Sequence, residues 1–169
     1  SQLMATVAAE RIWEELAGIL SQDEAAGLLR LMDLETGLLE AIIPEIAPLK
    51  GLQQGGYHHE DTWNHSLNVL ESLEAIVNTR GMAPEVSEYL QARIAGNRTR
   101  LVILKLAAIL HDIGKPSCQK PKESGGYSFH GHDRVGKQIA VDISRRLRIS
   151  GRESDLLRLL VREHMSPLS

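Results

Sequence analysis

Apolar residues recur every three or four positions along most of this chain, the spacing that places them on one face of an α-helix. The pattern predicts a first helix over residues 5–20 and a second helix that starts at a capping box, residues 21–24 (SQDE). Two short helical turns are expected over 38–43 and 44–49. Few stretches alternate apolar and polar residues as a half-buried strand does. The sequence therefore predicts an all-α fold.

A Gly-rich stretch at residues 51–56 is the clearest internal boundary of the sequence. It divides a small helical segment, residues 1–50, from a larger domain, residues 51–169. The larger domain is expected to open with a helix over 62–78, with Asp61 as its N-cap. The predicted order is thus a short helical segment followed by a helical domain.

Within that domain, a helix is predicted to open at Pro84 and to close at residues 96–97 (Gly-Asn). A strongly apolar helix follows, from Leu101 to the adjacent residues His111 and Asp112. Two metal-ligand residue types side by side at the end of a buried helix are unusual, so the rest of the chain is interpreted around this segment.

The remainder of the chain begins with a polar segment, residues 115–131, which is expected to be a long loop. Loops of this length are often functional. Two further helices are predicted over 133–147 and 151–164, and the second starts at another capping box, residues 150–153 (SGRE).

Composition narrows the class of protein. A length of 169 residues with 43% hydrophobic content suits a single domain with a real core. The net charge of -3 excludes an overall electrostatic affinity for nucleic acid, although a local basic face remains open. The single Cys118 rules out an internal disulfide and fits a reducing compartment. With no run near 18 apolar residues and no secretory signal pattern, we expect no membrane association and a cytoplasmic location.

The adjacent residues His111 and Asp112 are candidate metal ligands. Neighbours on a helix point about 100° apart, so both reach one ion only from the crevice between their faces. Imidazole and carboxylate groups suit Mn, Fe, Co, Ni or Zn, and the lack of a cysteine cluster argues against structural zinc. With His65 they would leave positions open for water and lower its pKa towards neutrality. His132 and His164 could hold a second ion or contact the leaving group.

Each histidine also has an ordinary interpretation. His164 could be a C-terminal cap of its helix, and His58 and His59 could be solvated loop residues. His130 could be a hydrogen-bond partner of a neighbouring histidine rather than a substrate contact. For Asp112 the ordinary alternative is an exposed helix end, but a carboxylate there opposes the helix macrodipole, which favours a functional role.

Basic residues supply candidate phosphate contacts. Lys115 lies three residues after Asp112 and could neutralise a phosphate, or be an ordinary surface lysine. Arg145, Arg146 and Arg148 make the C-terminal helices basic and could contact the phosphates of RNA. The alternative is that they form a solvated helix face.

These motifs, taken in order, resemble the HD superfamily of metal-dependent phosphohydrolases over about residues 56–167. The matching elements are an upstream histidine, LHDIGKP, FHGHD and VREHMSP. The resemblance implies a divalent metal, Mn, Fe, Co, Ni, Zn or Mg, and catalytic roles for Asp112 and Lys115. The implied metal ligands are His65, His111, Asp112, His132 and His164. His130 would join Lys115 and the three arginines in contacting substrate.

The first part of the chain resembles a second group of proteins. Residues 10–20 and the segments LLRLMDLETGLLEAIIPEIAPLKGLQQ and HHEDTWNHSLNVLE are similar to the neck and following HD region of bacterial tRNA nucleotidyltransferases and poly(A) polymerases. In that family a head transfers nucleotides and the neck binds RNA. This sequence has no Gly-Ser followed by an Asp-x-Asp motif, so nucleotide addition cannot come from these residues. The resemblance implies a fragment of such a protein or a free-standing relative of its C-terminal part.

One departure from the HD pattern is the absence of a further Asp after His164. The resemblance therefore implies a chain truncated at its C-terminus or an incomplete site. The favoured hypothesis is a phosphohydrolase acting on a nucleotide, a 2′,3′-cyclic phosphate or an RNA 3′ end. The alternative is a tRNA-binding neck and body with a vestigial metal site. A purely structural helical scaffold would require the histidine pattern to be coincidence.

Overall fold

The computed structural model describes residues 2–53, 60–79 and 82–166. Its first part is helical, and the elements are α1 (Gln2–Leu20), α2 (Ala25–Thr36), α3 (Leu38–Ile42) and a 3-10 helix η1 (Pro44–Leu49). The remaining helices are α4 (Thr62–Val77), α5 (Pro84–Gln91), α6 (Arg100–Leu110), α7 (Lys115–Cys118), α8 (His132–Arg146) and α9 (Gly151–Glu163). The prediction of an all-α fold is confirmed.

Two small antiparallel hairpins are the sheet structure of the described residues. One pairs β1 (Arg93–Ala95) with β2 (Arg98–Thr99), and the other pairs β3 (Lys120–Pro121) with β4 (Tyr127–Ser128). Both correct the sequence analysis. The helix from Pro84 ends at Gln91 rather than at residues 96–97, which instead form the turn of the first hairpin. The segment 115–131 contains a helical turn and the second hairpin instead of a structureless loop.

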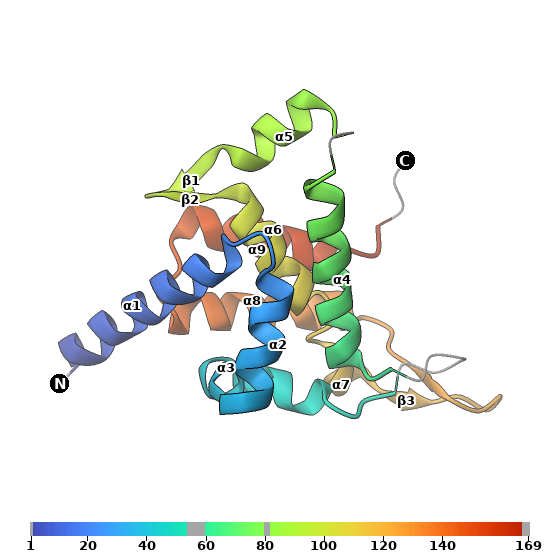
Figure 1. The fold of residues 1–169 in the computed structure, drawn as a ribbon. Coiled ribbons are helices and arrows are strands. Elements are labelled where there is room, and N and C mark those ends of the chain that lie inside the picture. The colour runs from blue at the N-terminus through green and yellow to red at the C-terminus, as the bar shows by residue number, and fades with distance from the viewer. Residues whose placement is uncertain (1, 54–59, 80–81, 167–169) are drawn as a thin grey trace.

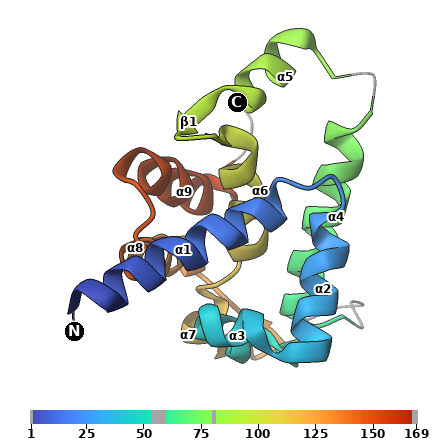
Figure 2. The same ribbon diagram turned by 60° about the vertical axis from the view of Figure 1, so that its left-hand side comes forward.

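Helix α6 lies at the centre of the fold, with α4, α9, α1 and α5 packed around it (Figures 1 and 2). Eight of its eleven residues are buried, because its sequence is apolar on almost every face. Helix α2 runs alongside α4, and α8 pairs with α9. The end of α6 is therefore surrounded by other helices, and His111 is the residue that follows it.

One hydrophobic cluster extends across both predicted segments. It includes Trp13, Leu29 and Ile46 from the first fifty residues and Leu106 and Leu157 from the rest. Such a continuous cluster ties the stability of the two segments together. The proposed division into residues 1–50 and 51–169 stays a prediction.

The helix N-termini test the local capping signals. Asp61 accepts a hydrogen bond from the Asn64 amide, and Ser150 and Glu153 form a capping box, so both predictions are confirmed. The predicted capping box over residues 21–24 is wrong. The Ser21 hydroxyl donates to the Gly18 carbonyl at the end of α1 instead.

The first two amides of α2 have a partner from a distant helix. The amides of Ala25 and Ala26 donate to the carboxylate of Glu74, at 2.8 and 3.2 Å. This carboxylate supplies the acceptor that a local cap would have supplied. Of the helices in the described ranges, none is long and apolar enough to cross a membrane.

Candidate metal centre

Four helices bring the candidate ligands to one place. His65 lies in the first turn of α4, and His111 and Asp112 directly follow α6. His132 is the first residue of α8, and His164 directly follows α9. The site thus assembles residues from the beginnings or ends of helices that are far apart in sequence. His58 and His59 lie outside the described residues.

The buried carboxylate of Asp112 is the centre of the cluster. Its Oδ2 atom lies 3.0 Å from Nε2 of His111, and its Oδ1 atom lies 3.3 Å from Nε2 of His132 and 3.8 Å from Nε2 of His164. Asp112 is only 2% exposed, so the ordinary interpretation as an exposed helix end does not apply.

Two groups of ligand atoms share this carboxylate. His65, His111 and Asp112 form one group, and Asp112, His132 and His164 form the other; within each, the ligand atoms lie within 4.8 Å of one another. Oδ2 of Asp112 faces His111, whereas Oδ1 faces His132 and His164. A carboxylate placed in this way could contribute one oxygen to each of two neighbouring metal ions.

Three of the histidines are fixed in the same way. Nδ1 of His111, His132 and His164 lies 2.8 Å from a carbonyl oxygen three residues earlier in the chain. Because a carbonyl oxygen can only accept, each Nδ1 must carry a proton and donate it. In the neutral ring, Nε2 is then the unprotonated atom that can bind a metal. The carbonyls that accept from His111 and His164 lie in the last turns of α6 and α9. Each of these two histidines therefore caps its helix and is also a candidate ligand.

The contact between His132 and His164 tests whether a metal fits. Their Nε2 atoms lie 3.0 Å apart, yet both rings already donate through Nδ1. Two lone pairs at this separation repel each other unless a proton or a cation lies between them or beside them. Imidazole nitrogens together with a carboxylate are a donor set for a divalent transition metal. The residues therefore fit the metal implied by the resemblance.

The electrostatics of the cluster keep its carboxylate ionised. Burial alone would raise the pKa of the Asp112 carboxyl, but hydrogen bonds from His111, His132 and Lys115 hold that pKa well below its usual range. Burial lowers the pKa of His65 and His164, which favours their neutral form. The hydrogen bond with Asp112 raises the pKa of His132, so a cation that binds Nε2 of His132 would have to displace a proton from it.

Lys115 lies at the edge of the cluster, as its position three residues after Asp112 suggested. Its Nζ is 2.7 Å from Oδ2 of Asp112 and 5.6 Å from the centroid of the Phe129 ring. The ammonium is mostly buried, with 12% of the side chain exposed, so it is not an ordinary surface lysine.

Glycine at position 114 allows the close approach of two chain segments, a requirement that the sequence analysis missed. A Cβ added there would lie 2.2 Å from the His132 carbonyl oxygen and 2.6 Å from the Gly136 amide nitrogen. This contact places His132 beside Asp112. The signal in the sequence was a glycine two residues after Asp112, in the motif LHDIGKP.

The predicted basic contacts are not all near the centre. His130 is exposed beside His132. Arg145 and Arg146 end α8, about 20 Å along the helix from His132 at 1.5 Å per residue, and Arg148 follows two residues later. Arg145 is paired with Asp142 and Arg146 with Glu45, while Arg148 has a left-handed backbone with φ 57°. A phosphate at the cluster and one at these arginines would be different phosphates.

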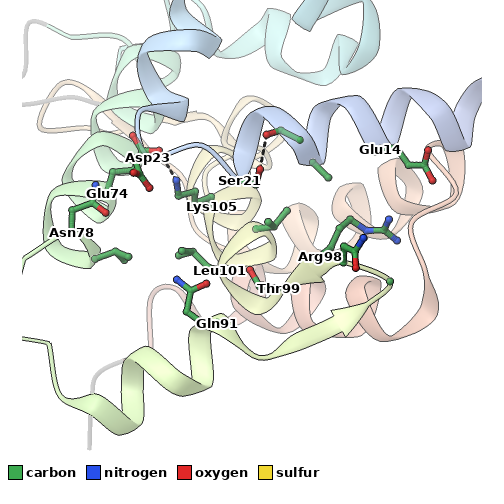
Figure 3. A pocket seen from close by; sticks show the side chains of 16 residues that line it. Glu14, Ser21, Asp23, Glu74, Asn78, Gln91, Arg98, Thr99, Leu101 and Lys105 are labelled. Carbon is green, nitrogen blue, oxygen red and sulfur yellow. Dashed lines mark hydrogen bonds and ion pairs between the residues drawn. The ribbon is translucent and has the colours of Figure 1, made fainter.

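A cavity of about 630 Å³ is lined by residues other than the five candidate ligands (Figure 3). It is lined by α1, the end of α4, the first hairpin and the start of α6. Its most buried charged groups, Lys105 and Glu74, are bonded to each other at 2.8 Å, and Lys105 also donates to the Gln22 carbonyl. These groups serve the fold, since they join α1, α2, α4 and α6.

Comparison with known proteins finds relatives named as tRNA nucleotidyltransferases and CCA proteins. The chain is 36% identical to the A-adding tRNA nucleotidyltransferase of Deinococcus radiodurans over 94% of its own length. It is 38% identical to the CC-adding tRNA nucleotidyltransferase of Thermus thermophilus over 95%, and 28% identical to the multifunctional CCA protein of an Azoarcus species over 92%. The chain spans only 32% of the length of each of these relatives.

Two family models divide the chain between them. Residues 1–50 match the family described as the probable RNA and SrmB-binding site of polymerase A. Residues 62–169 match the HD domain, and this range contains all five candidate metal ligands. The first match agrees with the resemblance to the neck of the polymerase family. With most of its length inside the second match, and with its histidines and Asp112 gathered at one centre, the chain belongs to the HD domain family.

Proposed function

We propose that this chain is a metal-dependent phosphohydrolase that acts on a nucleotide or an RNA-terminal phosphoester. The observation that carries the proposal is the convergence of imidazole Nε2 atoms on the buried Asp112 carboxylate, with Lys115 beside it. A cation-binding group next to a fixed ammonium is the arrangement that phosphoryl transfer requires, because that reaction depends on positioning and on the neutralisation of charge.

The proposed roles of the ligands follow their grouping. His65, His111 and Asp112 would hold one ion, and Asp112 with His132 and His164 would hold a second ion. A divalent cation, of the type Mn, Fe, Co, Ni, Zn or Mg, supplies Lewis acidity there and makes water acidic enough to ionise near neutral pH. The helix-end carbonyls keep Nδ1 protonated and so keep Nε2 directed at the ion.

The remaining residues act on the substrate in this proposal. The Lys115 ammonium donates hydrogen bonds to phosphoryl oxygens and offsets the negative charge that develops on them. His130, exposed beside His132, contacts the phosphoester from outside. The relatives named for tRNA support a nucleotide, a 2′,3′-cyclic phosphate or an RNA 3′ end, including that of tRNA, as the partner.

The test is to measure metal content and turnover in the same preparations. We expect stoichiometric metal by elemental analysis in the wild-type chain and in the control Arg158→Ala, whose side chain is exposed and paired with Asp155. His111→Ala and Asp112→Ala should lose both metal and hydrolysis of 2′,3′-cyclic and 3′-terminal phosphates. A protein that stays metal-free after reconstitution would contradict the proposal, and lost activity with full metal retention would contradict the ligand roles.

A second function has its own support in the match of residues 1–50 to an RNA-binding family. In this alternative the chain holds tRNA for a separate catalytic part, and the metal site is vestigial. It predicts salt-dependent RNA binding that weakens in Arg145→Gln and Arg148→Gln. Arg146→Gln is less informative because it also removes an ion pair with Glu45 of the first fifty residues, whereas Asp142, the partner of Arg145, lies in the same helix. Binding that is insensitive to salt and to both substitutions would exclude this function.

A further inference from the structure

A pocket of about 430 Å³ opens beside the metal centre and shares Lys115 and His132 with it. The rest of its lining comes from the second hairpin, the start of α8 and Met165. Its volume lies within the range of small-molecule binding pockets. A phosphoester whose phosphorus lies at the centre can therefore place its organic part in this pocket.

The charges of the lining favour an anionic ligand. Two lysines, Lys115 and Lys122, face the pocket, whereas the acidic group of the lining, Asp133, is already paired with Arg162. Since Lys115 lies against Asp112, Lys122 is the cation nearer the outer part of the pocket. This arrangement suits a molecule with negative charge at the centre and further negative charge towards the hairpin.

Two aromatic side chains form part of the same lining, and one of them is tied to the centre. The Phe129 carbonyl accepts the Nδ1 proton of His132 at 2.8 Å, and the Phe129 ring lies 5.6 Å from Lys115 Nζ. The Phe129 backbone is therefore tied to the candidate ligand His132, and the Phe129 ring lies beside Lys115. Tyr127, two residues earlier, lies in the hairpin with 42% of its surface exposed.

The hairpin fixes the position of Tyr127. Tyr127 pairs with Pro121 in the antiparallel register, and the Lys122 amide donates to the Gly126 carbonyl at 3.0 Å. The turn uses Gly125 and Gly126 at φ 86° and 77°, a conformation that other residues rarely adopt. In Figure 1 this hairpin reaches outward from the helical body, next to the short helix α7 that contains Lys115. An aromatic ring held in this way loses little conformational entropy when a flat ligand stacks on it.

We infer that Tyr127 and Phe129 form a nucleobase subsite and that Lys122 contacts a phosphate of the same nucleotide chain. The inference rests on the proposed function, because it concerns the substrate of that centre. It narrows the substrate class to phosphoesters that bear a base, as opposed to sugar or alkyl phosphates. Aromatic side chains accept any base by stacking, so the subsite selects for the presence of a base more than for its identity.

The test measures binding separately from turnover. Adenosine 3′-phosphate and glycerol 2-phosphate are titrated by calorimetry into EDTA-treated protein, where hydrolysis does not interfere. We expect the nucleotide to bind at least about tenfold tighter, the gain typical of one stacked base. Tyr127→Ala should remove most of this advantage and Tyr127→Phe should restore it. Tyr89→Ala is the matched control, since Tyr89 is 55% exposed on α5 and outside the pocket.

The outcomes separate this inference from the proposed function. Equal binding of the two phosphates, or a nucleotide advantage that survives Tyr127→Ala, would overturn the subsite even if the protein hydrolyses phosphoesters. A Tyr127-dependent advantage without any hydrolysis would support the subsite while the hydrolase proposal fails. Lys122→Gln should weaken a dinucleotide ending in a 3′-phosphate more than it weakens adenosine 3′-phosphate, and equal weakening would remove Lys122 from the subsite.

Discussion

Glu74 and Asp112 are both buried carboxylates with a lysine partner, but their surroundings differ. Glu74 lies 2.8 Å from Lys105, and its other contacts are the two amides at the start of α2. Asp112 lies 2.7 Å from Lys115, and its other contacts are imidazole rings. The lysine distances are almost the same, so the ion pair alone does not distinguish the two sites.

The difference lies in whether donors and acceptors match. Around Glu74, each carboxylate oxygen meets an N–H donor, so the site is complete without any further atom. Around Asp112, His132 and His164 bring Nε2 atoms together while both Nδ1 protons are already used. A buried charge with complete partners stabilises a fold, whereas a buried cluster of converging ring nitrogens and a carboxylate could hold a cation.

The largest expected effect is that of Asp112→Asn, which keeps the shape and removes the charge. We expect metal content to fall from stoichiometric to none, and hydrolysis to fall more than about 1000-fold, since changes to groups that merely support a metal ligand already cost about 10- to 100-fold. Elemental analysis and initial rates measure both quantities, with circular dichroism as the check on folding. Retention of metal in this variant would show that Asp112 is not the shared ligand.

Glu74→Gln should have the opposite effect, because it should lower the stability of the fold and leave metal binding unchanged. Because Lys105 would keep its charge without a counter-ion at 3% exposure, we expect the free energy of unfolding to fall by about 3–5 kcal/mol. Metal content should not change. Urea unfolding measures the loss, and Glu71→Gln on the exposed side of the same helix is the control. If the two variants unfolded alike, the buried pair would not be a major source of stability.

Gly114→Ala tests the packing that holds the centre together. The added Cβ would overlap the backbone of α8, so we expect a loss of about 1–3 kcal/mol in stability together with weaker metal binding. Gly27→Ala is a matched helix substitution with open space around it, and it should stabilise by about 0.5–1 kcal/mol. Thermal melting with and without metal compares them. Similar behaviour of the two variants would mean that the close approach is not required.

The smallest expected effect concerns Glu153, a third buried carboxylate. Burial alone would raise its pKa, but hydrogen bonds from Arg98 and from Ser150 lower it below its ordinary value. The lowered pKa means that the ionised Glu153 stabilises the folded protein. This stabilisation is fully present above about pH 4.5, the ordinary pKa of a glutamate, and it is lost as the pH falls through the lower pKa of the folded state. In urea unfolding between pH 7 and pH 3, the free energy of unfolding of Glu153→Gln should fall less with decreasing pH than that of the wild type. Glu88→Gln, which is exposed, should decline as the wild type does.

Signals that are local in sequence predicted most of the helices. The helix over 62–78, its Asp61 cap and the capping box at residue 150 depend on neighbouring residues and were confirmed. The start of α2 could not be predicted, because its acceptor is Glu74, 49 residues from Ala25. The hairpin after Gln91 was also missed, since strands of two or three residues are too short to show alternation.

At the candidate site too, the features that depend on neighbouring residues could be predicted and those that depend on distant contacts could not. The order of His65, His111, Asp112, His132 and His164 was available from the motifs, and the structure brings all five together. Their role as ligands stays a prediction. The fixed Nδ1 protons depend on carbonyls at helix ends, and the separation of the arginines from the centre depends on the length of α8. Neither the hydrogen bonds nor this separation could be predicted until the residues at which each helix begins and ends were known.

The contacts of Glu74 and Lys105 also have a consequence for synthesis on the ribosome. Lys105 donates to the carbonyl of Gln22, 83 residues earlier in the chain. At about 5–20 residues per second, roughly 4–17 s separate the synthesis of these two residues. When this interval begins α1 is already made, and α2 follows early in it, but α6, which packs against α1, is not yet made. The apolar faces of the first helices are therefore available to chaperones before the chain can bury them.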